Sequence, residues 1–217
     1  MRSKSGLMFV AKRPRRAAAL GAAAMFIATL ATGCSFEASV RYSPGDPPVD
    51  LPTASVALKT VNRRPPAHGG QTKCIERVRG GYGNPFPIYE KDAANVEIAV
   101  RDATADALLR AGISTADGGG PVLVTSVDEY WLDGFGSFNA TVTVDLVLQD
   151  AQGAPLWHRS VTSTGGDTMS WSVFEADRIA PTAFGYALRG VAAQLVTEFQ
   201  GDEFQRLVRP APTVATR

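Results

Sequence analysis

A strict alternation of apolar and polar residues between positions 139 and 149 constrains the fold of this chain more than any other feature. A period of two is typical of a β-strand with one buried face and one face in water. The next four residues read Asp-Ala-Gln-Gly, a turn composition, and residues 156–164 follow as a returning strand. The sequence therefore predicts an antiparallel hairpin. The alternating apolar positions are Ala140, Val142, Val144, Leu146 and Leu148.

Helical periodicity frames this hairpin on both sides. Apolar residues recur every three or four positions in residues 91–111 and again in 181–199, which predicts two helices with one apolar stripe each. A short helix is expected over residues 202–208, and strands over 54–61 and 121–127. Residues 62–90 are rich in Gly, Pro and Arg and predict no regular element. The stripes contain Val96, Val100, Ala103 and Ala107 in the first helix, and Phe184, Leu188, Val191, Leu195 and Phe199 in the second.

These elements predict an α+β domain of two layers. The expected order is β-α-β-β-β-α with a short C-terminal helix, and about four strands form a mostly antiparallel sheet packed against two helices.

The N-terminus has the three parts of a secretory signal. Six of its first sixteen residues are Lys or Arg, residues 17–30 are mostly apolar, and small residues precede Cys34. The apolar run is shorter than the ~20 residues that cross a bilayer. Ending on a cysteine, the segment resembles the bacterial lipobox, although Ala31 stands where that motif usually has Leu. The resemblance implies that Cys34 is acylated and becomes the first residue of the mature chain.

Removal of this signal changes the charge of the protein. The full chain has 22 basic and 21 acidic residues, and the loss of six basic residues leaves a mildly acidic protein. We therefore expect no nucleic-acid partner, because such binding needs clustered Lys and Arg. With Cys34 carrying lipid, Cys74 has no cysteine partner within the chain. We also expect no metal and no cofactor other than the covalent lipid, because His68 and His158 form no ligand pattern.

The predicted organisation has four parts. Residues 1–33 form the signal peptide, and residues 34–54 form the lipidated N-terminus and a Pro-rich flexible tether. Twenty extended residues would hold a domain up to roughly 60–70 Å from the bilayer. Residues 55–209 form the domain, and residues 210–217 form a disordered tail.

No catalytic constellation is visible in the sequence. The chain lacks a Gly-x-Ser-x-Gly elbow, a phosphate-binding P-loop and a His-Glu-x-x-His motif. His158 lies within a predicted strand, where a surface histidine is the simpler interpretation. The sequence therefore favours a protein that is not an enzyme, with an envelope hydrolase as a remote alternative.

Three segments have the composition of recognition surfaces. Segment 130–138 brings aromatic rings together around two glycines, and segment 169–174 precedes the second helix; both suit a protein interface or the edge of a core. In the third, Arg77 and Arg79 beside glycines suit either an anion site or a solvated turn. The aromatic candidates for partner binding are Tyr130, Trp131, Phe135, Phe138, Trp171 and Phe174.

The third segment also carries a family resemblance. Residues 75–83, Ile-Glu-Arg-Val-Arg-Gly-Gly-Tyr-Gly, resemble the "IG-x-VRNGYG" signature of YajG-type lipoproteins, with Glu76 in place of the first glycine. Residues 61–63 resemble the strand-ending "D-x-R" of that family, and the later elements agree in order. The resemblance implies an envelope lipoprotein without established enzymatic activity.

The sequence thus predicts a lipid-anchored, non-catalytic docking or accessory module that binds the bilayer through its acyl anchor and another envelope protein through its domain. Ser35, in place of the Asp that retains lipoproteins in the inner membrane, resembles an outer-membrane sorting signal, so the domain would face the periplasm. The alternative is an auxiliary carrier that holds lipid or glycan between helices and sheet, which a large apolar pocket would favour. Partner identity and oligomeric state stay open.

Overall fold

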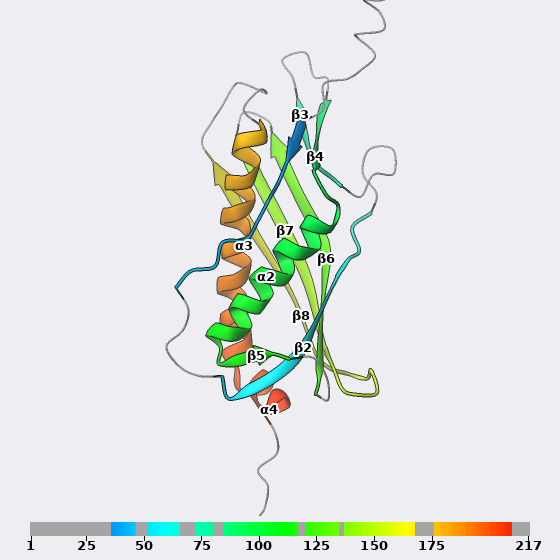
Figure 1. Ribbon diagram of the computed structural model, residues 1–217, viewed down its shortest axis with the longest axis vertical. Coiled ribbons are helices and arrows are strands. Elements are labelled where there is room, and N and C mark those ends of the chain that lie inside the picture. The colour runs from blue at the N-terminus through cyan, green and yellow to red at the C-terminus, as the bar shows by residue number, and fades with distance from the viewer. Residues whose placement is uncertain are drawn as a thin grey trace, which may run out of the picture. The chain divides into compact units, whose positions relative to one another are not determined.

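The computed structural model describes residues 36–46, 52–65, 73–79, 85–116, 120–134, 137–167 and 176–209. Its elements are β1 (Phe36–Ala38), β2 (Ala54–Asn62), β3 (Cys74–Arg79), β4 (Pro85–Glu90), α2 (Ala94–Arg110), β5 (Ile113–Thr115), β6 (Val122–Gly134), β7 (Phe138–Gln149), β8 (Pro155–Asp167), α3 (Ala176–Gln200) and α4 (Asp202–Val208). The α+β class is confirmed, and α2 and α3 lie over the same face of the sheet (Figure 1).

The predicted hairpin forms the regular part of the sheet. β7 pairs with β8 along its whole length and with β6 on its other side, both antiparallel. Residues of β7 alternate between buried and partly exposed. The Asp150 side chain accepts hydrogen bonds from the backbone N–H groups of Gln152 (2.9 Å) and Ala154 (2.8 Å). Gly153 has a φ of 84°, which suits glycine at the predicted turn.

The rest of the sheet corrects the prediction of about four, mostly antiparallel strands. β2 and β3 both pair parallel to β6, one after the other along the same edge. β4 is antiparallel to β3, whereas β1 pairs parallel to β4 and β5 parallel to β2. The sheet is therefore mixed, and it has eight strands within the described residues. Segment 62–90, predicted to lack regular elements, supplies β3 and β4.

The helices bury the stripes that periodicity predicted. Val96, Val100, Ala103 and Ala107 of α2 are fully buried, as are Phe184, Leu188, Val191, Leu195 and Phe199 of α3. α3 begins at Ala176, five residues earlier than expected, so Pro181 lies inside it. Because proline has no N–H, this position costs α3 one hydrogen bond close to its start.

α3 packs closely over β8 because two positions carry no side chain. A Cβ at Gly165 of β8 would collide with the backbone of Ala183 and Ala187, and a Cβ at Gly190 would collide with Ser163. Deeper in the core, the Tyr130 ring stacks on Phe184 with centroids 4.1 Å apart and planes 9° apart. The space between helices and sheet is filled by such side chains along the whole described core.

The N-terminal segment departs most from the prediction of a tether. β1 pairs with β4, and Ala38 and Val40 are 2% and 1% exposed. The N–H of Val40 donates to the buried Glu90 carboxylate at 2.9 Å, and the Tyr42 hydroxyl donates to Asp106 at 2.6 Å. Residues 36–46 are therefore part of the folded domain. Residues 47–51 lie outside the described residues.

Among the helices in the described part of the chain, none is both long and apolar enough to cross a bilayer.

Candidate interaction site

The sheet face opposite the helices carries an acid–aromatic–acid row. Glu129, Trp131 and Asp133 follow one another at every second position of β6, so their side chains share this face. Their partners across the strand pair are Thr143, Thr141 and Asn139 of β7. Glu129 and Asp133 are exposed and Trp131 is partly exposed. We call these three residues the β6 row.

A bulge in β6 creates this row. The register between β6 and β7 shifts between Val127 and Glu129, so one extra residue is accommodated there. Asp128 and Glu129 are consequently both exposed. Beyond the bulge the alternation is reset, which turns Tyr130 and Leu132 into the core and Glu129, Trp131 and Asp133 away from it.

A notch in the sheet edge lies beside the row. β2 pairs with β6 as far as Val127, and β3 pairs with it from Leu132. Arg64 occupies the interval, where its Nη1 donates to the carbonyl oxygens of Tyr130 (2.9 Å) and Cys74 (3.4 Å). Burial lowers the pKa of this guanidinium. The notch has a volume of about 190 Å³ and is lined by Arg64, Pro65, Cys74, Asp128, Glu129, Tyr130 and Trp131.

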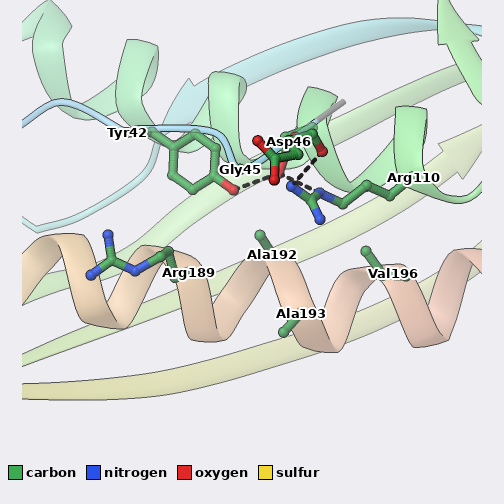
Figure 2. Close-up of a pocket in the computed structure, with 9 residues that line it drawn as sticks. Tyr42, Gly45, Asp46, Arg110, Arg189, Ala192, Ala193 and Val196 are labelled. Atoms are coloured by element: carbon green, nitrogen blue, oxygen red, sulfur yellow. Dashed lines mark hydrogen bonds and ion pairs between the residues drawn. The ribbon is translucent and has the colours of Figure 1, made fainter. Parts of the chain in front are cut away.

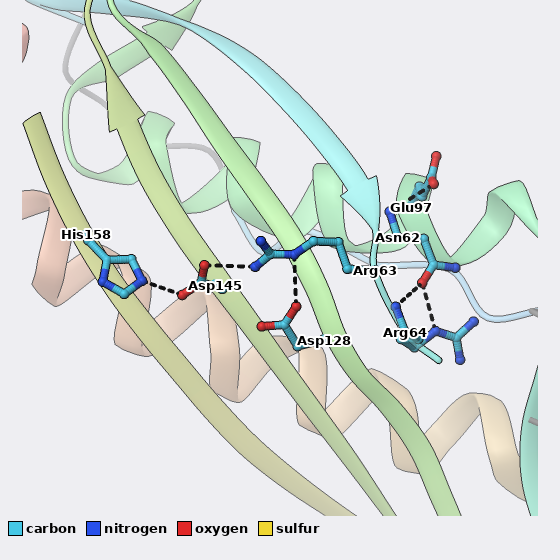
Figure 3. A network of polar contacts seen from close by, with 7 residues as sticks. All are labelled: Asn62, Arg63, Arg64, Glu97, Asp128, Asp145 and His158. Atoms are coloured by element: carbon cyan, nitrogen blue, oxygen red, sulfur yellow. Dashed lines mark hydrogen bonds and ion pairs between the residues drawn. The ribbon is translucent and has the colours of Figure 1, made fainter. Parts of the chain in front are cut away.

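A polar network continues across the same open face (Figure 3). Arg63 donates from Nε to Asp128 (3.2 Å) and from Nη2 to Asp145 (2.9 Å). The other Asp145 oxygen lies 2.5 Å from Nε2 of His158. The His158 side chain is 62% exposed on the flat sheet rather than held in a cleft. This position matches the surface role expected for His158 and offers no support for a catalytic base.

The aromatic candidates fall into three groups in the structure. Tyr130 and Phe138 are 1% and 3% exposed, so their rings belong to the core and are not available to a partner. Trp131 is the candidate that reaches the surface among those described. The other aromatic candidates, Phe135, Trp171 and Phe174, lie outside the described residues, as does Cys34.

The predicted anion site is placed only by its backbone. Arg77 and Arg79 lie on β3, where they pair with Pro87 and Pro85 of β4. They therefore belong to a strand rather than to the turn considered from the sequence, and an anion site there stays a prediction.

A second hollow lies on the helical side, between the N-terminal segment, α2 and α3 (Figure 2). It has a volume of about 670 Å³ and includes Ala192, Ala193 and Val196 in its wall. Asp106 joins two other lining residues, because it accepts from Tyr42 at 2.6 Å and from Nε of Arg110 at 2.9 Å. Burial and the hydrogen bond to Asp106 raise the pKa of Tyr42.

This hollow does not resemble the pocket of a lipid carrier. A carrier was expected to hold its cargo between helices and sheet, but that layer is filled by the buried core. The hollow instead mixes apolar residues with ion-paired side chains at the surface. The described residues therefore leave no carrier pocket between the helices and the sheet.

The fold defines a class: an α+β domain whose mixed sheet is covered by two long helices on one face. Protein XCC0632 from Xanthomonas campestris, of family model DUF330, has this fold, with a TM-score of 0.51 and 18% identity over 80% of this chain and 99% of that chain. A minor lipoprotein from Acinetobacter baumannii is similar at a TM-score of 0.43 and 13% identity, over 75% and 100% of the two chains. This lower similarity supports no conclusion about the present chain.

No model of a known family matches this chain, and no curated protein matches its sequence. The similarity to XCC0632 thus establishes a shared fold, whereas the resemblance to YajG-type lipoproteins stays a prediction.

Proposed function

We propose that this protein is a bacterial envelope lipoprotein, anchored by lipid on Cys34, that docks another envelope protein without catalysing a reaction. We place it in the outer membrane, facing the periplasm, because Ser35 follows the lipidated cysteine. The lipobox-like leader supports the anchor. The β6 row supports the docking function, and it is the single observation on which the choice of surface rests.

The β6 row has the chemistry of a site for a cationic side chain. A Lys or Arg over the face of an indole is worth about 0.5–2 kcal/mol, depending on how far it is desolvated. Glu129 and Asp133 supply a carboxylate on each side of Trp131. Arg64 adds one positive charge in the adjoining notch, but the ion pair of Arg63 with Asp128 is internally balanced. The row itself carries two negative charges, and Arg77 of β3 is the register neighbour of Asp133. The attraction for a Lys or Arg of a partner therefore centres on Glu129 and the Trp131 ring.

Site-specific photo-crosslinking in the native envelope tests this proposal. A crosslinking residue at Asp133 should give one discrete protein adduct, whereas the same residue at exposed Leu156, near the opposite end of the sheet, should not. Trp131→Ala should reduce the adduct at Asp133 about tenfold, the scale of a tryptophan hot spot worth about 1.4 kcal/mol or more. The matched control is Leu156→Ala, which should leave the adducts unchanged.

A change in the charge of the β6 row gives a second test that does not depend on Trp131. Glu129→Lys should abolish the adduct at Asp133 while far-UV circular dichroism stays that of the native protein, because Glu129 is exposed. Equal adducts in the native protein, Trp131→Ala and Glu129→Lys would exclude the β6 row as the docking surface.

A further inference from the structure

The folded domain begins almost immediately after the proposed lipid site. β1 starts at Phe36, two positions after Cys34. It is fastened by pairing with β4, by the bond from Val40 N–H to Glu90, and by the Lys91 N–H, which donates to the Ala38 carbonyl at 3.0 Å. Two extended residues span at most about 7 Å. The link between lipid and domain is therefore about a tenth of the tether that composition predicts.

The strand register shows where on the domain this link is attached. Phe36 is connected to Ala140 by a row of pairing partners that crosses the sheet from strand to strand. We call this row a level of the sheet. Ala140 lies two residues after the start of β7 and nine before its end, which at ~3.4 Å per residue is about 7 Å and 30 Å. The level consists of Phe36, Ile88, Glu76, Leu132 and Ala140.

The near end of the sheet is formed by the outermost paired residues of several strands. We call it the proximal end, and it comprises Arg79, Pro85, Gly134, Phe138 and Asp167. The opposite, distal end contains the β7–β8 turn at residues 150–154. Figure 1 shows β1 beside β3 and β4 at the upper end of the view and this turn at the lower end.

We infer that the proximal end of the domain rests against the lipid surface of the membrane and that the β7–β8 turn points away from it. This inference rests on the proposed lipidation of Cys34. The link of about 7 Å, added to about 7 Å from Phe36 to the proximal end, keeps that end within about 15 Å of the acylated residue. Since the headgroup layer of each leaflet is about 5–7 Å thick, the proximal end can lie at most about 8–10 Å above it.

The orientation restricts which partners can reach the β6 row. Trp131 pairs with Thr141, three residues from the start of β7, and Glu129 pairs with Thr143, five residues from it. These positions lie about 10 and 17 Å from the proximal end. The cationic group of a partner must therefore be presented within roughly 30 Å of the acylated residue.

Energy transfer to the bilayer surface tests the orientation. The lipidated full-length protein is reconstituted into phosphatidylethanolamine–phosphatidylglycerol vesicles that carry an acceptor dye on a lipid headgroup. A donor dye is attached through an azide-bearing residue at Asn139, close to the proximal end, or in a second variant at Gln152 in the distal turn; both positions are exposed. We expect transfer from Asn139 to be severalfold more efficient than from Gln152. Equal efficiencies, or a higher efficiency from Gln152, would overturn the inference.

A linker variant tests whether the short link is the cause. A flexible twenty-residue Gly-Ser segment inserted between Ser35 and Phe36 should reduce transfer from Asn139 severalfold and remove most of its difference from Gln152. Unchanged transfer from Asn139 would show that the link does not set the orientation, which contradicts the inference.

A separate flotation assay tests the lipid anchor itself. The native protein should float with the vesicles, and the Cys34→Ser variant should not. If the native protein does not float, the proposed anchor is wrong. The orientation is then measured on the leaderless chain coupled at Cys34 to a maleimide headgroup lipid, with the same two dye positions and the same expected ratio.

Discussion

Tyr130→Phe removes a buried hydroxyl from the core of the domain. The residue is 1% exposed, and its Oη has no hydrogen-bond partner among the described residues. Burial, followed by the nearby charge of Glu90, raises the pKa of this phenol well above its ordinary value, so it stays protonated. Phenylalanine keeps both the stack on Phe184 and the ring face 5.5 Å from the Arg64 guanidinium. The variant thus removes the hydroxyl and little else.

Two opposing effects set the size of the change. An unsatisfied buried polar group costs about 1–3 kcal/mol, which the variant recovers. The void left by one oxygen, roughly 15 Å³, costs only about 0.4 kcal/mol at ~24 cal/mol per Å³. We therefore expect the free energy of unfolding to rise by about 0.6–2.6 kcal/mol. Each kcal/mol corresponds to about 2–4 °C in Tm for a chain of this size.

Urea denaturation followed by far-UV circular dichroism measures this change. Tyr186→Phe is the matched control, because Tyr186 is 49% exposed and its hydroxyl can bond to water; its effect should stay within about 0.5 kcal/mol. A loss of 1 kcal/mol or more in Tyr130→Phe would refute the reasoning, since it would mean that the hydroxyl has a partner in solution.

Three further perturbations test other parts of the fold. Gly165→Ala places a methyl against the backbone of α3 and should cost about 1–3 kcal/mol or more in urea denaturation. Glu90→Gln should flatten the dependence of Tm on pH. Burial raises the folded-state pKa of Glu90, so the native state binds this proton more readily than the unfolded chain does. Stability therefore falls as the pH rises from the ordinary carboxyl pKa through the raised pKa of the folded state. Asp106→Asn should weaken the Tyr42 hydrogen bond that holds the N-terminal segment on α2, as well as the Asp106–Arg110 ion pair within α2, and speed trypsin cleavage after Arg41 severalfold.

Each of these variants has its own control. Gly185→Ala lies on α3, where a Cβ meets only the Arg189 side chain, at 3.8 Å, and it should be neutral or stabilising by up to ~1 kcal/mol. Equal denaturation midpoints for the two glycine variants would contradict the close packing. An unchanged pH slope in Glu90→Gln would show that Glu90 does not titrate as argued. Asp102→Asn, at an exposed pair on α2, should leave trypsin cleavage unchanged. Cleavage as fast as in Asp106→Asn would show that the bond between Tyr42 and Asp106 does not hold the N-terminal segment.

Local periodicity predicted the elements that bury one face along their whole length. β7 and the stripe of α3 follow from repeats of two and of 3.6 residues, and both are as expected. β3 and β4 were missed because Pro85, Pro87 and several charged residues hide any alternation in strands of six residues. Parallel pairing could not be predicted either, since it joins segments far apart in the chain and leaves no local turn signal.

The N-terminal segment did contain a signal that composition obscured. Ala38, Val40 and Tyr42 alternate with polar residues, and all three pack on the core. The prolines that follow them suggested a tether for the whole stretch.

The sequence predicted only part of the candidate site. Trp131 was predicted from aromatic composition, but Tyr130 and Phe138 were grouped with it although they face the core. Nothing in the sequence distinguishes Glu129 from the adjacent Asp128 as part of a site. The bulge between Val127 and Glu129 decides which of the following residues face the core and which face away from it. A bulge depends on the register of two strands, so the residues of one strand do not predict it.

The distance in sequence between paired strands has a consequence for the order of folding. β7 and β8 are joined by a short turn, so their pairing closes a small loop, whereas β1 must find a strand more than fifty residues later. Because loop-closure entropy delays distant contacts, we expect the hairpin to form early and β1 to dock last. Under the proposed lipidation, Cys34 is reached by its acylating enzyme on a long free segment until that final step. The tether predicted from the sequence thus describes the segment before β1 docks, whereas in the folded domain β1 starts only two positions after Cys34.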